Sequence, residues 1–405
     1  MYTNNIYTPI QFENYSPKKQ LSWPKELPPL SIYIHVPWCI KKCPYCDFNT
    51  YVNKQNNKIP ERAYLDAIRS DLEQSLPLIW GRKIISIFIG GGTPNLLSSY
   101  AIDELLNILR KLLNPPSDIE ITMEANPGTV ESERFEDYAK SGINRFSLGI
   151  QSFNDKHLKK IGRLHNSDQC YSAIEIAQKS VDKINIDIMF ALPEQNIKEC
   201  LLDIKQAIKL GINHISAYQL SIEPNTIFFK KPPKVPNNDS SANMQDIIEM
   251  ELAQNSFERY EVSSYAINGN KSVHNMNYWQ FGDYLGLGPG AHGKISLNGK
   301  IIRQIRLHNP NLWIKNAIIG NGNHILEERI ISVNELPFEF MLNALRLKNG
   351  VETSLFYKRT GLFLTKITNK LRKACKSNLL DNDPRYLKAT QMGWRYLSNL
   401  QEIFL

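Results

Sequence analysis

Three cysteines within eight residues form the densest cluster of reactive side chains in this sequence. Cys39, Cys43 and Cys46 follow the apolar run SIYIHV with the spacing C-x3-C-x2-C, and they are half of the six cysteines in the chain. Closely spaced thiolates on a loop are the usual ligands of zinc and of iron–sulfur clusters. This segment is therefore the first candidate for a reactive centre.

Three kinds of site could use these thiols. Disulfides are disfavoured because three is an odd number and a chain of 405 residues can build a core without covalent links. A structural zinc ion takes four ligands, for which His35 and Asp47 are the nearby fourth donors. An iron–sulfur cluster held by three thiolates would leave one iron open to a small ligand. Zinc and the cluster both remain open at this point.

The cysteine spacing, with Tyr45 just before the third cysteine, resembles that of the radical S-adenosylmethionine (radical SAM) superfamily. In that family three cysteines hold a [4Fe-4S] cluster, and the amine and carboxylate of SAM bind the remaining iron. The resemblance implies that Cys39, Cys43 and Cys46 are the cluster ligands and that SAM is a cofactor.

Six short runs rich in Ile, Val and Phe predict β-strands in the first half of the chain. They lie at residues 31–36, 84–89, 119–124, 144–150, 184–190 and 214–222, with helical periodicity between them. Because parallel neighbours need a crossover connection, these units predict a parallel sheet with helices outside it. The expected fold is α/β: a partial (β/α)6 TIM-like barrel of the radical SAM type, with a doubly wound open sheet as the alternative.

Polar or glycine-rich signatures stand at the ends of the predicted strands. The segment GGGTP at 90–94 follows the second strand, Glu124 ends the third, Gln151 follows the fourth and Asp187 lies within the fifth. Each alone is compatible with an ordinary turn or a solvated strand end. In a barrel, however, the carboxyl ends of the strands converge on one mouth. We therefore expect these residues to surround the cysteine loop.

Eight segments narrow the resemblance, and they cover nearly the whole chain. In order they are IHVPWCIKKCPYCDF, FIGGGTP, EANPGT, RFSLGIQSF, GRLH, NIDIMFALP, HNMNYW and GLGPGAHG. They resemble the oxygen-independent coproporphyrinogen III oxidase group and, within it, the branch of heme chaperones. Carried over to matching positions, the resemblance implies that SAM is surrounded by Tyr33, Tyr45, Gly91, Gly92, Thr93, Glu124, Gln151, Arg163, Asp187, Ser221 and His292.

Two features distinguish the branches of that group. The oxidases have a fourth cysteine where this chain has Phe48, which argues against porphyrinogen decarboxylation and leaves open whether the chain is an enzyme. The second feature is the motif HN-x-x-YW, which begins at His274. A lone histidine near a turn is usually a surface or capping residue. Beside Tyr278 and Trp279, which offer flat apolar faces to a porphyrin, His274 is predicted to bind heme.

Composition sets the remaining expectations. The chain has no apolar run long enough for a membrane span and no signal-peptide pattern at its start, so we expect a cytoplasmic protein. Cys170, Cys200 and Cys375 are expected to be buried free thiols. Of the net charge of +8, residues 351–405 supply most, with ten Lys or Arg against four Asp or Glu. A solvated basic face is favoured there over a nucleic-acid site.

These observations divide the chain and suggest its function. The expected parts are an N-terminal arm (1–29), the partial barrel (30–229), a linker and α/β extension containing HN-x-x-YW (230–335), and a helical, winged-helix-like module (336–405). The expected function is a heme chaperone that transfers heme to an acceptor hemoprotein, which could be a membrane-associated member of the respiratory chain. Alternatives are an oxygen-independent coproporphyrinogen III oxidase and, more weakly, an RNA-modifying radical SAM protein; a homodimer is left open.

Overall fold

Six parallel strands form the centre of the sheet in the computed structural model, which describes residues 26–53, 59–129 and 131–405. They are β1 (Leu30–Val36), β4 (Ile84–Gly91), β5 (Glu120–Ala125), β6 (Arg145–Gln151), β7 (Lys183–Phe190) and β8 (His214–Gln219). They are neighbours in this same order. A doubly wound sheet would reverse its order at a switch point. The partial barrel predicted from the sequence is therefore confirmed.

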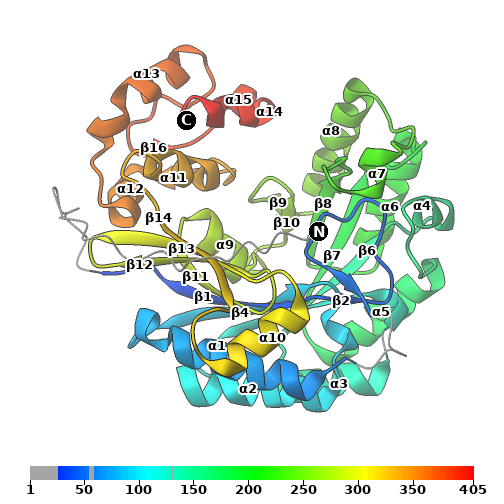
Figure 1. Cartoon of the computed structure of the whole chain (residues 1–405). Helices are drawn as coiled ribbons and strands as arrows, with labels where there is room; N and C mark the ends of the chain where they lie inside the picture. Colours follow the sequence, from blue (N-terminus) through cyan, green and yellow to red (C-terminus); the bar gives the residue numbers. More distant parts are fainter. Residues whose placement is uncertain (1–25, 54–58, 130) are drawn as a thin grey trace, which may run out of the picture.

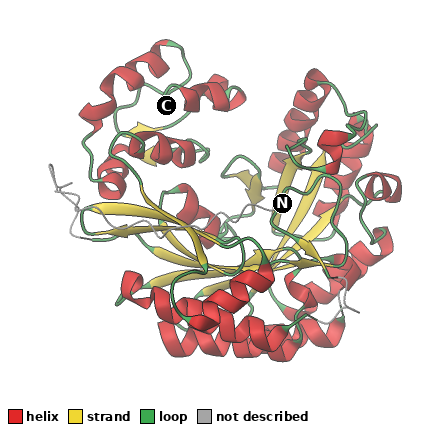
Figure 2. Cartoon of the chain, in the orientation of Figure 1, coloured by secondary structure: helices red, strands yellow, loops and turns green. Residues whose placement is uncertain are grey.

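The sheet continues past both edges of this barrel (Figure 2). Beside β1 stands β11 (Asp283–Leu287), which is parallel to it, followed by antiparallel β12 (His292–Leu297), β13 (Lys300–Arg306) and β14 (Ile325–Ile330). Beside β8 stand β10 (Ser264–Ala266) and β9 (Glu258–Arg259). The described sheet has twelve strands and does not close, because β14 and β9 end it on opposite sides. The sequence predicted an α/β extension at 230–335, but not that its strands continue the sheet of the barrel.

Helices cover the outer face of the barrel, as the blue and cyan ribbons at the bottom of Figure 1 show. They are α1 (Glu61–Ile79), α2 (Ser99–Leu113), α3 (Ser132–Ser141), α4 (Asp155–Lys160), α5 (Ser167–Ser180), α6 (Ile197–Lys209) and the later α10 (Pro310–Ile319). Short 3-10 turns, η1 (Pro94–Leu96) and η2 (Pro127–Thr129), follow β4 and β5. Gly142 ends α3 at a φ of 117°, which a residue with a Cβ rarely adopts.

The two faces of the barrel strands differ in polarity. Met123 and Leu148 belong to the outer hydrophobic core, whereas the alternate residues Thr122, Ser147 and Asn185 are buried polar groups on the inner face. Because side chains alternate along a strand, every second residue of β5, β6 and β7 lies inside the barrel. The barrel interior is therefore a packed polar layer below the strand ends.

Residues between the barrel and the last module continue the same sheet and core. They include α7 (Ile227–Lys230), α8 (Asn238–Gln254) and α9 (Val273–Trp279). The linker expected at the start of the 230–335 part is short, because α7 ends at Lys230, the Asn237 side chain caps α8 and α8 begins at Asn238. Most of the predicted N-terminal arm lies outside the described residues. No helix in the described ranges is long and apolar enough to cross a membrane.

The last seventy residues pack around a second hydrophobic core, shown at the upper left of Figure 1. Its elements are α11 (Leu336–Ala344), β15 (Val351–Glu352), α12 (Thr353–Thr360), η3 (Leu364–Ile367), α13 (Thr368–Lys376), β16 (Tyr386–Leu387), α14 (Gln391–Arg395) and α15 (Leu397–Glu402). The pair β15–β16 has only two residues on each side, and Thr390 caps α14 shortly after β16. Cys170 and Cys200 are buried as expected, but Cys375 is only half-buried.

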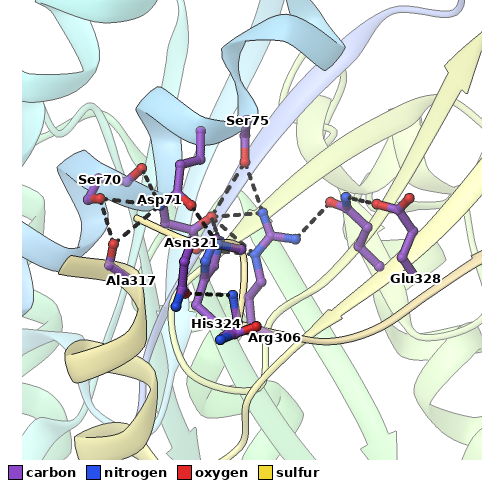
Figure 3. Close-up of polar contacts among 12 residues, drawn as sticks. Ser70, Asp71, Ser75, Arg306, Ala317, Asn321, His324 and Glu328 are labelled. Atoms are coloured by element: carbon purple, nitrogen blue, oxygen red, sulfur yellow. Dashed lines mark hydrogen bonds and ion pairs between the residues drawn. The ribbon is translucent and has the colours of Figure 1, made fainter. Parts of the chain in front are cut away.

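A network around a buried ion pair, Asp71 and Arg306, joins α1 to the edge strands (Figure 3). Asp71 on α1 accepts hydrogen bonds from Arg306 Nη2 at 2.9 Å and Nε at 3.1 Å, and His324 Nε2 lies 3.1 Å away. Gln304 accepts from Arg306 Nη1 at 2.8 Å, and its own amide reaches Glu328. The side chains of Asp71 and Arg306 are both 0% exposed. Each buried charge is therefore paired, as a buried charge must be.

Candidate functional site

A cavity of about 390 Å³ lies at the carboxyl ends of the barrel strands. Its volume lies within the range of about 300–1,000 Å³ that is common for ligand pockets. Twelve of the fifteen residues proposed from the sequence line it: Cys39, Cys43, Tyr45, Cys46, Gly91, Gly92, Thr93, Glu124, Gln151, Arg163, Asp187 and Ser221. The expectation that polar strand ends converge on the cysteine loop is thus met by the geometry.

The cysteine loop is fixed at both of its ends. It contains β2 (Trp38–Cys39) and β3 (Tyr51–Val52), which pair with each other in parallel. Between them, Cys46 N donates to Cys43 O at 3.1 Å and forms a tight turn. Cys39 is buried and the other two thiols are half-buried at the cavity wall. The loop therefore presents three sulfurs to one space.

The glycine-rich segment after β4 is close-packed against this loop. A Cβ at Gly92 would stand 2.5 Å from Trp38 O and 3.0 Å from Cys39 Sγ, and one at Gly91 would stand 2.8 Å from the His35 ring. Gly91 also has a φ of 121°. Only glycine fits both the conformation and the contacts at Gly91. The segment brings its backbone to the cavity wall beside the first cysteine.

Two carboxylates face the cavity from neighbouring parts of the sheet. Burial, followed by the charge of Asp187, raises the pKa of Glu124 to about 7, although Gly91 N–H donates to it at 3.0 Å. Burial raises the pKa of Asp187 to about 6, against the hydrogen bond from Asn185. Neither acid forms a salt bridge within the described chain. Their negative charge would be stabilised by a cationic ligand.

Arg163 joins the cysteine loop to β6. Its Nη1 lies 3.8 Å from Cys43 Sγ and its Nη2 donates to Gly149 O at 2.7 Å. Burial alone would lower the pKa of this guanidinium, but Tyr45 and Cys43 raise it above its usual value. Gln151, at the end of the same strand, has a φ of 70°. A left-handed backbone at a residue other than glycine is a strained feature that often accompanies a binding site.

The donor set fits an iron–sulfur cluster. Cys39, Cys43 and Cys46 are free thiols that line one cavity. A cluster needs thiolates that are spread over several iron atoms. Burial raises the pKa of the Cys39 and Cys46 thiols, so an entering metal centre must displace their protons.

Three residues proposed from the sequence do not line the cavity. Tyr33 lies inside the barrel, where its hydroxyl is 2.9 Å from His35 Nδ1. His292 is exposed at the start of β12. His274 is buried in the first turn of α9, with Nδ1 3.1 Å from Ser86 Oγ and its ring 4.9 Å from that of Phe88. The structure therefore places the predicted heme ligand in the barrel interior rather than at the mouth.

The aromatic residues of HN-x-x-YW also pack differently from the prediction. Tyr278 contacts the rings of Trp279 and Tyr284, at centroid distances of 4.9 and 5.0 Å. Trp279 packs against the core of the C-terminal module, and Arg346 covers its ring at 4.4 Å. These rings join the barrel to the C-terminal module and do not form an open flat surface. The motif thus lies on a helix between two packed regions.

Sequence reasoning missed several residues of the cavity wall. Ser147 and Gly149 line it, and their alternation with the outward-facing Leu148 could have revealed them. Phe48 also borders the cavity and is 63% exposed, which no pattern in the sequence predicts. Tyr218 comes from β8, next to β7 in the sheet. Whether Tyr218 reaches the cavity depends on the order of the strands in the sheet, which the sequence alone does not determine.

Two family models match separate parts of the chain. The model described as the Radical SAM superfamily matches residues 33–207, and the model described as the HemN C-terminal domain matches residues 331–396. The first covers the cysteine loop and most of the barrel. The second covers the C-terminal module from before α11 to α14.

Similar proteins extend these matches over nearly the full length. Proteins named heme chaperone HemW from Buchnera aphidicola (Schizaphis graminum), Haemophilus influenzae and Escherichia coli are 44%, 43% and 41% identical. Each alignment covers 94% of this chain and 99% of the relative. The solved structure of Escherichia coli coproporphyrinogen III oxidase (HemN) is 22% identical, with a TM-score of 0.79 over 93% of this chain and 90% of that one. The last match concerns the fold alone.

Proposed function

The chain belongs to the heme chaperone HemW family of radical SAM proteins, and from this we propose that it binds heme and transfers it to an acceptor hemoprotein. We further propose that it contains a [4Fe-4S] cluster and SAM. The observation on which the proposal depends is the convergence, on one cavity, of three free thiols and two carboxylates that form no salt bridge within the described chain. Because thiolate ligands persist under reducing conditions, we propose the cytoplasm as its compartment.

Each group of the cavity has a role in this proposal. Cys39, Cys43 and Cys46 would hold the cluster, whose remaining iron would bind the amine and carboxylate of SAM. Glu124 and Asp187 would stabilise the positive charge of SAM or bind its hydroxyl groups, since carboxylates accept such hydrogen bonds. All these residues line the same space.

His274 has the protonation state that an axial ligand needs. Burial lowers its pKa to about 4, so the imidazole is neutral at neutral pH, the form that binds metals. Ser86 Oγ donates to Ser31 Oγ at 2.7 Å, so His274 Nδ1–H donates to Ser86 and the lone pair is on Nε2. Nε2 would bind the heme iron. Because the ring is enclosed by Phe88 and Tyr33, coordination requires α9 to shift.

The cofactor content tests the first part of the proposal. Iron and sulfide are measured in anaerobically reconstituted wild type, in Cys43→Ser and in the control Cys375→Ser, which changes a thiol outside the cavity. We expect the cluster in the wild type and in the control and its loss from Cys43→Ser. Zinc without sulfide in the wild type would reject the cluster.

Heme titration followed by absorption spectroscopy tests the second part. We expect His274→Ala to lose heme affinity or to change the heme spectrum, whereas the matched buried histidine of α4, in His157→Ala, has no such effect. Unchanged heme uptake by His274→Ala would remove the role of this histidine. Complementation of a strain that lacks coproporphyrinogen III oxidase would favour the enzyme instead. We expect none, because Phe48 offers no sulfur at that position.

A further inference from the structure

A chain of buried hydrogen bonds leads from the cavity into the barrel interior. It starts at Asp187, whose carboxylate accepts from Asn185 Nδ2 at 2.9 Å. Asn185 Oδ1 lies 2.6 Å from His214 Nδ1, and His214 Nε2 lies 2.8 Å from the Tyr260 hydroxyl. Ser272 N then donates to Tyr260 Oη at 3.3 Å. Except for the cavity-facing Asp187, these residues are at most 4% exposed.

The ionised carboxylate at one end of this chain fixes the direction of every side-chain hydrogen bond in it, and the backbone N–H at the other end is consistent with that direction. A carboxylate only accepts and a backbone N–H only donates. Asn185 must therefore donate to Asp187 through its amide nitrogen, so its oxygen accepts from His214 Nδ1–H. His214 Nε2 then has the lone pair, and the Tyr260 hydroxyl donates to it. All donors point toward Asp187, an arrangement in which each bond polarises the next.

Side branches support this assignment of donors. Ser216 Oγ donates to Asn185 Oδ1 at 2.9 Å, and Asn185 Nδ2 also donates to Ser147 Oγ at 2.7 Å. The Asn185 amide is thus held by four partners in one orientation. Burial lowers the pKa of His214 well below its usual value, so its ring is neutral as the chain requires. In this arrangement every side-chain polar atom of Asn185 and His214 has a partner.

The far end of the chain is the first turn of α9. Ser272 caps this helix, and its Oγ accepts from Asn275 N at 3.3 Å. The next residue, Val273, donates its N–H to Glu120 Oε1 on β5 at 2.9 Å. His274 follows directly. The hydrogen-bonded chain thus connects a carboxylate at the cavity to the helix that contains the predicted heme ligand (Figure 1 shows α9 beside β11 and β4).

We propose that His214 and Tyr260 are positioning residues that hold the Asp187 carboxylate for SAM and join it to α9, so that SAM binding and heme binding affect each other. This inference rests on the proposed binding of SAM and heme. Neither residue lines the cavity, so their effect on SAM passes through Asn185 and Asp187. Coupling of this kind is reciprocal: if SAM changes the affinity for heme, heme changes the affinity for SAM by the same factor.

SAM affinity tests the positioning role and needs no heme. Equilibrium dialysis with labelled SAM is carried out on cluster-reconstituted wild type, Tyr260→Phe and Tyr138→Phe. Tyr138 is the matched control, a buried tyrosine of α3 whose hydroxyl donates to Leu97 O at 2.6 Å. We expect Tyr260→Phe to weaken SAM binding by about three- to tenfold, the worth of one buried hydrogen bond, and Tyr138→Phe to leave it unchanged. Equal SAM affinity in the two variants would overturn the proposal.

Two substitutions of His214 separate positioning from packing. Glutamine has both a donor and an acceptor and can bridge Asn185 and Tyr260, whereas leucine has neither. We expect His214→Gln to retain most of the SAM affinity and His214→Leu to lose it at equal iron content. If both variants bind SAM equally well, the chain has no positioning role.

The heme affinity measured with and without saturating SAM tests the coupling. We expect the ratio of the two values to differ from one by at least about threefold in the wild type and in Tyr138→Phe, and to approach one in Tyr260→Phe. A ratio of one in the wild type would overturn the coupling. If the wild type binds no heme at all, the proposed function fails, while the SAM measurements still decide the role of Tyr260.

Discussion

Asp71 and Asp187 are the acids of two buried polar networks in this protein, and they differ in how their negative charge is compensated. Burial alone would raise the pKa of Asp71, but Arg306 and His324 hold it below its usual value. Burial raises the pKa of Asp187 to about 6, against hydrogen bonds from Asn185, Ser216 and Ser147 and the charge of Arg163. Arg306 forms a salt bridge with the first acid, whereas the second forms none among the described residues, although the charge of Arg163 lowers its pKa. The first network is complete within the protein, while the carboxylate of the second is left to pair with a cationic ligand.

This difference separates residues that stabilise the fold from residues that bind. The Asp71 network joins α1 to the loop before β14, and none of its members lines the cavity. The Asp187 network ends at the cavity and contains no ion pair among its central residues Asn185 and His214. Breaking the first should therefore change the free energy of unfolding. Breaking the second should change the affinity for SAM.

The largest effect is expected from Arg306→Met. This change leaves Asp71 as a buried charge without its guanidinium, which should cost about 3–5 kcal/mol in free energy of unfolding. Urea denaturation measures the loss. At temperatures where the variant is folded, we expect its SAM affinity to match the wild type, because the network is separate from the cavity.

The double variant Asp71→Leu/Arg306→Met is the control for this measurement. It removes both charges, so it should recover most of the stability lost by the single change. A single variant that loses less than about 1 kcal/mol would contradict the assignment of this network to stability. Weaker SAM binding by the folded single variant would contradict the separation of the two networks.

Much of the cavity could be predicted from the sequence, because its residues belong to recognisable local patterns: the cysteine spacing and the ends of apolar runs that predict strands. Cys39, Cys43 and Cys46 stand in one loop, and Glu124 and Asp187 stand on strands that apolar runs predict. Parallel strands then bring these positions to one mouth. The cavity thus follows from local patterns and one rule of topology.

The remaining features depend on tertiary contacts that no local pattern shows. His274 was predicted to bind heme, yet its ring packs against that of Phe88, because α9 lies against β1 and against β4, which is almost two hundred residues away in the sequence. The bond between His214 and Tyr260 spans two strand regions separated by the predicted linker. Strands were expected in the 230–335 extension, but their place at the edge of the barrel sheet depends on the pairing of β11 with β1, which are far apart in the sequence. Sequence spacing gives no information on such contacts.

The second expected effect is a pH dependence of SAM binding. A cation binds the carboxylate form of Glu124, and the pKa of this acid is about 7 in the protein without ligand. Protonation of Glu124 therefore competes with SAM binding below pH 7. The dissociation constant of SAM should rise about tenfold from pH 8 to pH 6. Equilibrium dialysis with labelled SAM at pH 8, 7 and 6, at constant iron content, measures this dissociation constant.

Glu124→Gln is the control for this pH dependence. We expect it to bind SAM more weakly at pH 8 and to show little change between pH 8 and pH 7, because Asp187 titrates lower, near 6. A wild-type affinity that does not vary between pH 8 and 6 would show that no cavity carboxylate is protonated in competition with SAM. Asp71 cannot produce this dependence, because its pKa is lowered and it stays ionised throughout.

The smallest effect is expected from a matched pair of serine changes, one in each network. Ser75 Oγ accepts from Arg306 Nη2 at 3.1 Å, and Ser216 Oγ donates to Asn185 Oδ1 at 2.9 Å. Each hydroxyl is buried, so Ser75→Ala and Ser216→Ala should each cost about 0.5–1.5 kcal/mol in free energy of unfolding. Only Ser216→Ala should weaken SAM binding, by about twofold, since only Asn185 leads to the cavity. If Ser75→Ala and Ser216→Ala lose equal stability and still bind SAM equally well, the network below Asp187 only stabilises the fold, as the Asp71 network does, and has no role in SAM binding.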